Sequence, residues 1–132
     1  MAYSNDREIA TATIASGGSL SAAVPLGGKT VVGIMPPTGS GAFDATTVYI
    51  LFSVSADGTT YSLLRDKDGS VVYVTVAENN TYGAMPLDPA EFAAWTFVKV
   101  ATYATDKTTA VTQTPAASAD TYIPLILAKI TG

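Results

Sequence analysis

Turn-forming residues interrupt this chain so often that few helices of ordinary length fit between them. Clusters rich in Gly, Pro, Asp and Asn lie at residues 16–18, 27–28, 36–41, 56–58, 66–69 and 78–80. Between these clusters, β-branched and aromatic residues predominate, which is typical of strands. Asp57-Gly58 and Asp68-Gly69 are strong hairpin signals, because glycine readily adopts the positive φ that tight hairpin turns require. The spacing predicts an all-β fold made of short strands.

The chain of 132 residues is predicted to form a single domain, residues 1–132, with the architecture of an antiparallel β-sandwich of jelly-roll type. One short helical turn is expected at residues 88–92, where Asp88 is a good N-cap, Pro89 suits the first helical position and Glu91 the third. Residues 105–119, rich in Thr, Ala and Ser, are expected to form a long exposed loop. The predicted strands cover residues 8–14, 19–24, 30–35, 46–54, 60–64, 71–76, 81–85, 96–105 and 122–129.

Two of the predicted strands are apolar on both faces. In residues 48–54 and 122–130, apolar side chains occupy both sets of alternating positions. Such two-sided burial is typical of central strands, or of a strand whose outer face contacts another subunit. Pro124 removes one backbone donor from the second of these strands and so predicts an edge position or a bulge there.

The chain contains no histidine and no cysteine. This excludes disulfide bonds, ordinary zinc sites and the Ser-His-Asp and Cys-His catalytic arrangements. The Gly-rich segments lack the spacing of phosphate-binding loops, and none is expected to precede a helix. We therefore expect no cofactor and no metal, and we do not expect an enzyme.

Charge is sparse along the sequence. Charged residues make up 14% of the chain, against roughly 25% in typical soluble domains. The 7 basic residues are scattered singly and the formal net charge is −4, so neither nucleic acid nor an anionic membrane surface is an expected partner. The first ten residues lack the pattern of a secretory signal, and export by that route is not expected. A weakly charged exterior is compatible with one partly covered by other subunits, and equally with a neutral surface rich in Thr and Ser.

Acidic residues offer two candidate sites. Residues 66–69 resemble the start of a calcium loop, but Val71 and Ala77 stand where that motif requires Gly and Glu, so we interpret the segment as a hairpin turn. A pair of carboxylates for glycoside cleavage requires two acids across a cleft. Asp57 with Asp66 or Asp68 would share one end of a sandwich, although nothing in the sequence marks a member with a raised pKa.

Aromatic residues suggest a third candidate. They would form a stacking platform of the kind that sugar-binding sandwiches use, or else Trp95 and Phe97 belong to the core while the tyrosines lie at its margin. Subunit interfaces are also rich in Tyr and Trp, so these residues do not decide between the alternatives. The residues concerned are Tyr61, Tyr73, Tyr82, Trp95, Phe97 and Tyr103.

Three stretches of the sequence, in order, share features with a known group of proteins. They are Thr13 to Val24 followed by Leu26 to Pro36, then Phe52 to Tyr61, then Pro86 to Phe92 leading into Phe97-Val-Lys-Val100. Together they resemble small proteins encoded among the head genes of tailed bacteriophages and phage-like elements. Within that group, the resemblance is to capsid decoration (cement) proteins.

The resemblance implies a structural virion protein that lies on the outer surface of the capsid and is made in the host cytoplasm. Decoration proteins are commonly small β-sandwiches or β-tulips that sit as oligomers on the shell and bridge major capsid subunits. The implied partners are the major capsid protein and further copies of this chain, with a trimer favoured. An N-terminal arm, residues 1–8, would be a tether, and its candidate capsid or subunit contacts are Ala2, Tyr3, Ser4, Asn5, Asp6, Arg7 and Glu8.

A second resemblance leads to a different class of function. The segment from Phe52 to Tyr61, with a later Phe-Val-Lys-Val strand, is similar to discoidin-type sandwiches, which carry a comparable Ser-x-Asp-Gly turn. It implies a carbohydrate-binding module of a phage fibre or spike. The acidic calcium loop common in that family is missing here.

Overall fold

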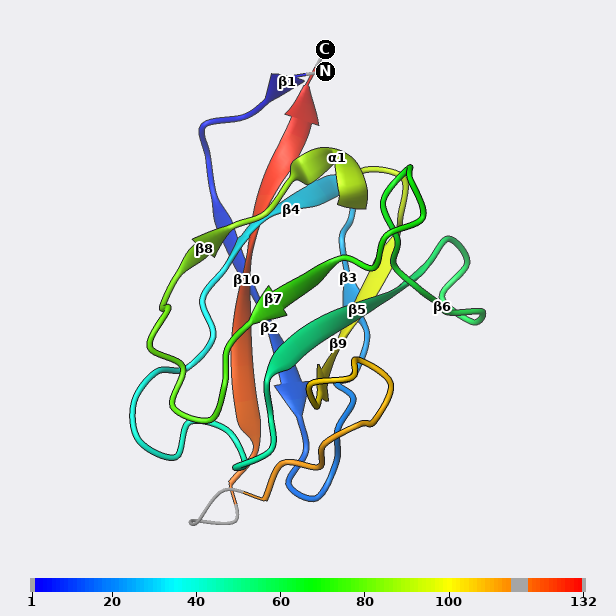
Figure 1. The fold of residues 1–132 in the computed structure, drawn as a ribbon. Coiled ribbons are helices and arrows are strands. Elements are labelled where there is room, and N and C mark those ends of the chain that lie inside the picture. The colour runs from blue at the N-terminus through cyan, green and yellow to red at the C-terminus, as the bar shows by residue number, and fades with distance from the viewer. Residues whose placement is uncertain (1, 115–118, 132) are drawn as a thin grey trace.

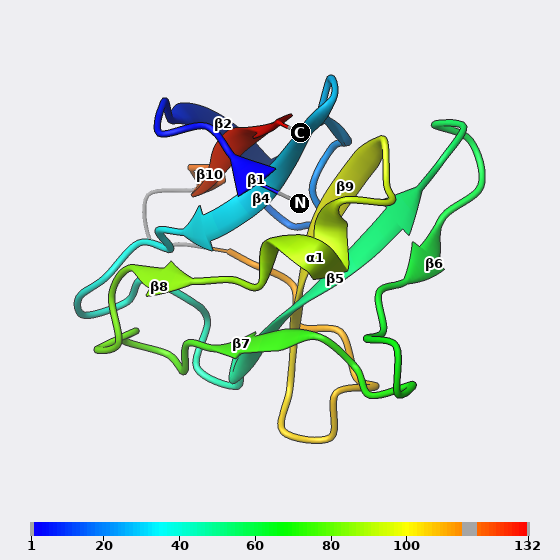
Figure 2. The same ribbon diagram turned by 90° about the horizontal axis from the view of Figure 1, so that it is seen from above.

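A computed structural model shows two antiparallel sheets of five strands each, which pack against one another around one core (Figures 1 and 2). The structure describes residues 2–114 and 119–131. The predicted all-β class is confirmed, and the arrangement is sandwich-like. The first sheet contains β1 (Ala2–Tyr3), β2 (Glu8–Ile14), β4 (Lys29–Ile34), β8 (Met85–Pro86) and β10 (Thr121–Thr131). The second contains β3 (Val24–Pro25), β5 (Tyr49–Ser55), β6 (Ser62–Leu63), β7 (Tyr73–Thr75) and β9 (Phe97–Tyr103).

Strands distant in the sequence lie side by side in both sheets. In the first sheet β10 lies between β2 and β4, and β8 pairs with the far side of β4. In the second sheet β9 lies between β3 and β5, while β6 and β7 both pair with β5. Successive strands therefore often belong to different sheets, and both sheets are completed only when residues near the end of the chain fold back.

Alternating side chains from both sheets form the core. Ile14 of β2 and Leu125 of β10 face inward from the first sheet, and Phe52 of β5 and Val100 of β9 from the second, all of them fully buried. Phe92, from the helix α1 (Pro89–Phe92), packs edge-on against Phe52 with ring centroids 5.2 Å apart. The helix therefore closes one end of the core, as Figure 1 shows.

The helix forms where its capping residues predict it. The Asp88 carboxylate accepts a hydrogen bond from the Ala90 N–H at 3.0 Å, and Pro89 occupies the first helical position. The Thr30 hydroxyl donates to the Pro89 carbonyl at 2.7 Å, which fixes the helix to β4. The N-cap prediction is confirmed.

Several strand bounds differ from those predicted. The prediction for β2 is confirmed at both ends. Residues 60–64 and 71–76 contain only the short strands β6 and β7, and residues 81–85 contain only the first residue of β8. Most of residues 19–24 is not a strand, because this segment crosses from one sheet to the other. The Ser21 N–H donates to Val100 of the second sheet, and the Ala22 N–H donates to Thr13 of the first.

The prediction of an edge position at Pro124 is wrong, because β10 is a central strand with partners on both sides. The Pro124 carbonyl accepts from the Met35 N–H at 2.9 Å. In an antiparallel strand, the carbonyl and the nitrogen of one residue point to the same side. The Pro124 nitrogen, which carries no hydrogen, therefore points toward the β4 side, just past the last residue of β4. The irregularity of the ladder lies at Ile126 and Leu127 instead.

The expectation of an exposed loop at residues 105–119 is confirmed for most of its described residues but wrong for two of them. Val111 is buried, and Gln113 is 1% exposed. The Gln113 amide donates to the Thr47 and Thr102 hydroxyls at 2.9 and 3.1 Å, and its oxygen accepts from the Asp44 N–H at 2.9 Å. Residues 115–118 of the predicted loop lie outside the described residues.

Both hairpin signals are confirmed. In the β5–β6 turn the Asp57 carboxylate accepts from the Thr59 and Thr60 N–H groups, each at 2.8 Å, and from the Ser55 hydroxyl. These bonds, led by the two backbone donors, lower the pKa of Asp57 to about 2. Gly58 follows with φ +80°, where a Cβ would lie 3.0 Å from the Phe97 ring.

This turn predicts a pH-dependent contribution to stability. Because the folded-state pKa of Asp57 is depressed from 3.8 to about 2, its carboxylate stabilises the fold above the unfolded value and ceases to do so as pH falls through about 2. We expect Asp57→Asn to lower the melting temperature at neutral pH, and the difference from the native chain to shrink near pH 2. Melting curves across this range test it. Asp68→Asn, in the neighbouring turn, is the control and should change the melting temperature at neutral pH much less.

Candidate functional site

The outer face of the first sheet, along β2 and β10, is formed mainly by apolar side chains with two threonines and no charged residue. The side chains of β2 and β10 that point away from the core lie opposite one another in the ladder, as Ile9 and Ile126 do. Ile9 is 65% exposed, Tyr122 56% and Met35 47%. We call this surface the neutral face, and it comprises Ile9, Thr11, Thr13, Met35, Tyr122, Pro124 and Ile126.

Alternation along β2 and β10 produces the neutral face. Because Ala12, Ile14 and Leu125 are buried in the core, their neighbours in the strand must face outward. Gly33 of β4 lies beside Ile126, and a Cβ there would be 3.7 Å from that side chain. The absence of a side chain at Gly33 leaves Ile126 accessible beside it. The two-sided apolar pattern of residues 122–130 therefore reflects one face in the core and one outside it.

The outer face of the second sheet carries aromatic rings and two lysines. Tyr49 and Tyr73 pack edge to face with centroids 5.0 Å apart, and the Lys107 ammonium lies 4.1 Å from the centre of the Tyr73 ring. Lys99 lies over the Tyr61 ring at 4.3 Å. Favourable cation–π contacts of this kind hold the lysines against the face rather than leaving them extended.

The aromatic prediction is partly corrected. Trp95 packs at the margin of the core, but Phe97 stands on the outer face of β9, in the same alternation as Lys99 and Tyr103. Tyr61, Tyr73, Tyr103 and Phe97 thus share one outer face, which the sequence did not indicate because their strand register was unknown. Trp95 instead lines a separate hollow.

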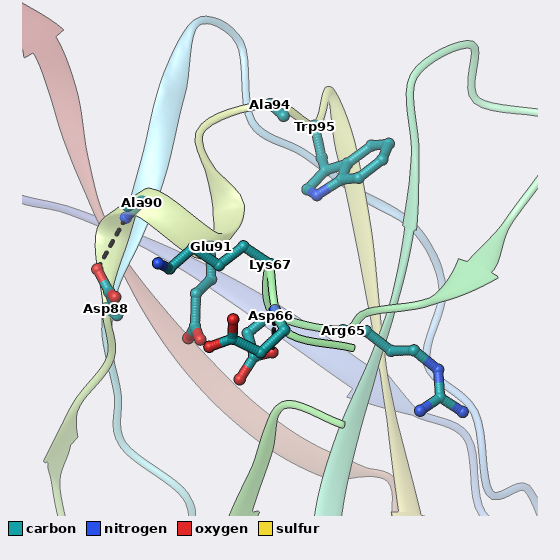
Figure 3. A pocket seen from close by; sticks show the side chains of 9 residues that line it. Arg65, Asp66, Lys67, Asp88, Ala90, Glu91, Ala94 and Trp95 are labelled. Carbon is teal, nitrogen blue, oxygen red and sulfur yellow. Dashed lines mark hydrogen bonds between the residues drawn. The ribbon is translucent and has the colours of Figure 1, made fainter. Parts of the chain in front are cut away.

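That hollow has a volume of about 480 Å³ and lies between α1 and the turn that follows β6. Its walls include Trp95, four acidic residues and two basic ones, namely Asp66, Asp68, Asp88, Glu91, Arg65 and Lys67. Figure 3 shows the carboxylates of Asp66 and Glu91 near one another and the Arg65 side chain pointing away. Asp57, the predicted partner of Asp66 and Asp68, does not line this hollow, and its carboxylate accepts hydrogen bonds within its own turn. The acids that share the hollow with Asp66 and Asp68 are Asp88, the N-cap of α1, and Glu91 of α1.

The acidic side chains of this hollow, which we call the acidic hollow, lie close enough to change the pKa of one of them. Partial burial raises the pKa of Glu91, and the negative charges of Asp88 and Asp66 raise it further. The Asp66 carboxylate accepts from the Asp68 and Ser70 N–H groups at 2.9 and 3.0 Å, as expected for the predicted turn. In the described part of the chain, no three acidic side chains are placed to hold a metal ion. The hollow therefore offers an indole and carboxylate acceptors to a ligand with hydroxyl groups.

The N-terminal arm folds onto its own chain. Ala2 and Tyr3 form β1 and pair with Thr131 and Ile130 of β10, and the Ser4 N–H donates to the Lys129 carbonyl at 2.8 Å. Glu8 begins β2 and forms an ion pair with Lys29. The candidate contacts of the arm therefore lie at one end of the first sheet, and most of them are exposed: Ala2, Asn5, Asp6, Arg7 and Glu8.

The structure also shows whether any described helix could cross a membrane. The only helix among residues 2–114 and 119–131 spans four residues, and none is long and apolar enough to cross a membrane.

Comparisons with known proteins do not identify a family for this chain. No model of a protein family matches the chain. A search of curated proteins likewise finds no significant match. The function is therefore inferred from three surfaces, namely the neutral face, the aromatic outer face of the second sheet and the acidic hollow.

Proposed function

We propose that this chain is a structural virion protein of a tailed bacteriophage, a capsid decoration (cement) protein that works by binding and not by catalysis. The observation that carries the proposal is the neutral face. Single exposed apolar residues are common on soluble proteins, but a contiguous apolar patch without charges is typical of an interaction surface. The partner in this proposal is the major capsid protein, on the outer surface of the shell.

The strand order supports the finer assignment of a jelly roll within the all-β class. The orders β2-β10-β4-β8 and β3-β9-β5-β6 distribute successive strands between two sheets, as two intertwined Greek keys do. Jelly rolls occur in viral capsid proteins and in lectin domains, so the fold is compatible with both functions that the sequence suggests.

Burial of the neutral face would stabilise a shell without any chemical step. Each Å² of apolar surface removed from water contributes about 25 cal/mol, and one copy that contacts two capsid subunits opposes their separation. Tyr122 lies at one end of the face, opposite Thr13, with more than half of its surface exposed. The exposed arm residues from Ala2 to Glu8 are a second contact in this proposal, at one end of the same sheet.

The alternative function, a carbohydrate-binding module of a fibre or spike, is favoured by one specific observation. Trp95 lies in a hollow with the carboxylates of Asp66, Asp88 and Glu91 (Figure 3). An aromatic ring with nearby acceptors suits a ligand that has one apolar face and several hydroxyl groups. A hollow of about 480 Å³ lies within the range of small-molecule sites.

The decisive experiment is binding to purified shells of the phage or phage-like element that encodes the chain. We expect the native chain to bind shells, and Tyr122→Asp to weaken binding about thirtyfold, which corresponds to about 2 kcal/mol, the loss typical of a well-buried interface tyrosine. Tyr73→Asp is the matched control, because this tyrosine is 46% exposed on the outer face of the other sheet. It should leave shell binding unchanged.

Mass spectrometry of the purified particles supplies the second measurement. A shell protein should be present in copy numbers comparable with the major capsid protein. Absence from particles would contradict the proposal, and so would equal weakening by both tyrosine variants. Binding on a glycan array that Trp95→Ala abolishes, without shell binding, would establish the alternative function.

A further inference from the structure

The strands of the second sheet carry positive charge and no negative charge. None of β3, β5, β6, β7 and β9 contains Asp or Glu, and Lys99 of β9 is the only charged residue in them. Lys107, from the turn that follows β9, lies over the outer face of the same sheet. The aromatic outer face of the second sheet therefore presents two ammonium groups in a chain whose formal net charge is −4.

Both ammonium groups are free to bind an anion. Among the residues that the structure describes, the only ion pair joins Lys29 to Glu8, in the first sheet. Asp57 and Asp106, the acids in the turns beside the aromatic outer face, each accept hydrogen bonds from backbone N–H groups of their own turns. Cation–π contacts orient an ammonium group but do not remove its charge.

The turn that follows β9 holds Lys107 in a fixed position. Lys107 adopts a φ of +59°, which is uncommon for a residue other than glycine, and its N–H donates to the Ala104 carbonyl at 3.0 Å. Its ammonium group lies 4.1 Å from the centre of the Tyr73 ring and 4.5 Å from that of Tyr49. Backbone conformations of this kind are concentrated at binding sites, where the surrounding structure imposes them.

The two lysines belong to two similar units on the face. Lys99 lies 4.3 Å from the centre of the Tyr61 ring, as Lys107 lies over Tyr49. Tyr49 pairs with Tyr103, which stands four residues after Lys99 on the same side of β9. At about 3.4 Å per residue, the two units are therefore about 14 Å apart along the strand. A ligand that reaches both is a chain of several rings and not a single small anion.

We propose that the aromatic outer face of the second sheet binds an acidic polysaccharide, with sugar carboxylates on Lys99 and Lys107 and sugar rings against the tyrosines. A sugar ring has an apolar face that packs on an aromatic side chain, and Tyr73 is 46% exposed. The bond between an ammonium group and a carboxylate is charge-assisted and therefore strong. Nucleic acid suits this face less well, because its closely spaced phosphates favour a row of basic residues.

This site is separate from both surfaces discussed under the proposed function. The two sheets pack core to core, so their outer faces lie on opposite sides of the molecule (Figure 2). A chain attached to a shell by its neutral face would thus present the aromatic outer face to solution. The acidic hollow around Trp95 would repel the same ligand, because four carboxylates line it. The inference does not depend on the proposed capsid function.

Isothermal titration calorimetry with polygalacturonate tests the proposal, and the methyl ester of this polymer, which has the same rings without the charges, is the matched ligand. We expect the native chain to bind polygalacturonate, and Lys99→Gln and Lys107→Gln each to weaken binding about tenfold, as expected for the loss of one charge-assisted hydrogen bond. Lys107→Arg keeps the charge and should weaken binding less. Lys129→Gln, at an exposed residue of β10, makes the same change in net charge and should leave binding unchanged.

Several results would overturn the proposal. They are no binding of polygalacturonate, equal affinity for the methyl ester, and equal weakening by Lys129→Gln and Lys107→Gln in variants with the native circular dichroism spectrum. Tighter binding of a single-stranded oligonucleotide that depends on the same two lysines would also overturn it, because the ligand would then be nucleic acid. Tyr122→Asp and Trp95→Ala should leave polygalacturonate binding unchanged, so this proposal and the proposed function can fail separately.

Discussion

Replacing Phe92 with alanine is expected to lower the free energy of unfolding by about 3–5 kcal/mol, the usual cost of deleting a buried phenylalanine ring. Phe92 is completely buried although it belongs to a helix of only four residues. Its ring packs against Phe52 of the second sheet, while the Thr30 hydroxyl holds the same helix on the first. Loss of the ring would leave a cavity at the end of the core where both sheets meet the helix. Urea unfolding followed by circular dichroism measures the change.

Two variants control for this prediction. Phe92→Leu keeps an apolar side chain at the position and should lose much less stability than alanine. Glu91→Ala alters the neighbouring residue, whose side chain lines the acidic hollow, and should change the free energy of unfolding by no more than about 0.5 kcal/mol. A loss below about 1 kcal/mol for Phe92→Ala would show that α1 is not part of the cooperative core.

Replacing Gln113 with leucine, a side chain of similar size, is expected to cost about 2–5 kcal/mol. Each buried polar group that loses its partner costs about 1–3 kcal/mol. The substitution deprives the Asp44 N–H of its acceptor and the Thr47 hydroxyl of its donor, both beside a residue that is 1% exposed. The Thr102 hydroxyl keeps its hydrogen bond to the Val111 carbonyl at 2.7 Å, so the loss of Gln113 at Thr102 should cost less stability than at Asp44 and Thr47. The same unfolding measurement applies.

The matched control for Gln113 is its exposed neighbour Thr112, whose replacement by alanine should be nearly neutral. If Gln113→Leu were as stable as the native chain, the segment that contains Val111 and Gln113 would not be fixed in the core as the structure has it. Hydrogen exchange supplies a second test of this prediction. Because Gln113 joins Asp44 and Thr47 to β9, the variant should also increase hydrogen exchange at the Asp44 N–H.

Features with a local cause were predictable from the sequence. The bounds of β2 follow from alternation between Glu8 and Ile14, and both Asp-Gly hairpins follow from the positive φ that glycine supplies. The helix begins after Asp88, because capping depends on residues only two positions apart.

Features of the candidate sites had no local signal. Asp66 and Glu91 line the same hollow although 25 positions separate them, because the turn that follows β6 and the helix α1 lie at the same side of the fold. Gln113 stands in a polar stretch that resembles a loop, and only its three partners from distant segments make its burial favourable. The missing donor of Pro124 predicts an edge position or a bulge at that residue, yet β10 is central, the irregularity lies at Ile126 and Leu127, and β4 ends where the donor would have been needed.

The sequence by itself determined that the chain is all-β, with turns and one helical turn at particular residues, because backbone preferences and capping act over a few neighbouring positions. It also excluded histidine and cysteine chemistry outright. Only the tertiary structure decided which strands are neighbours and which apolar face remains outside. Strand partners are selected by the joint burial of side chains far apart in the chain, and that free energy exists only once both sheets are assembled.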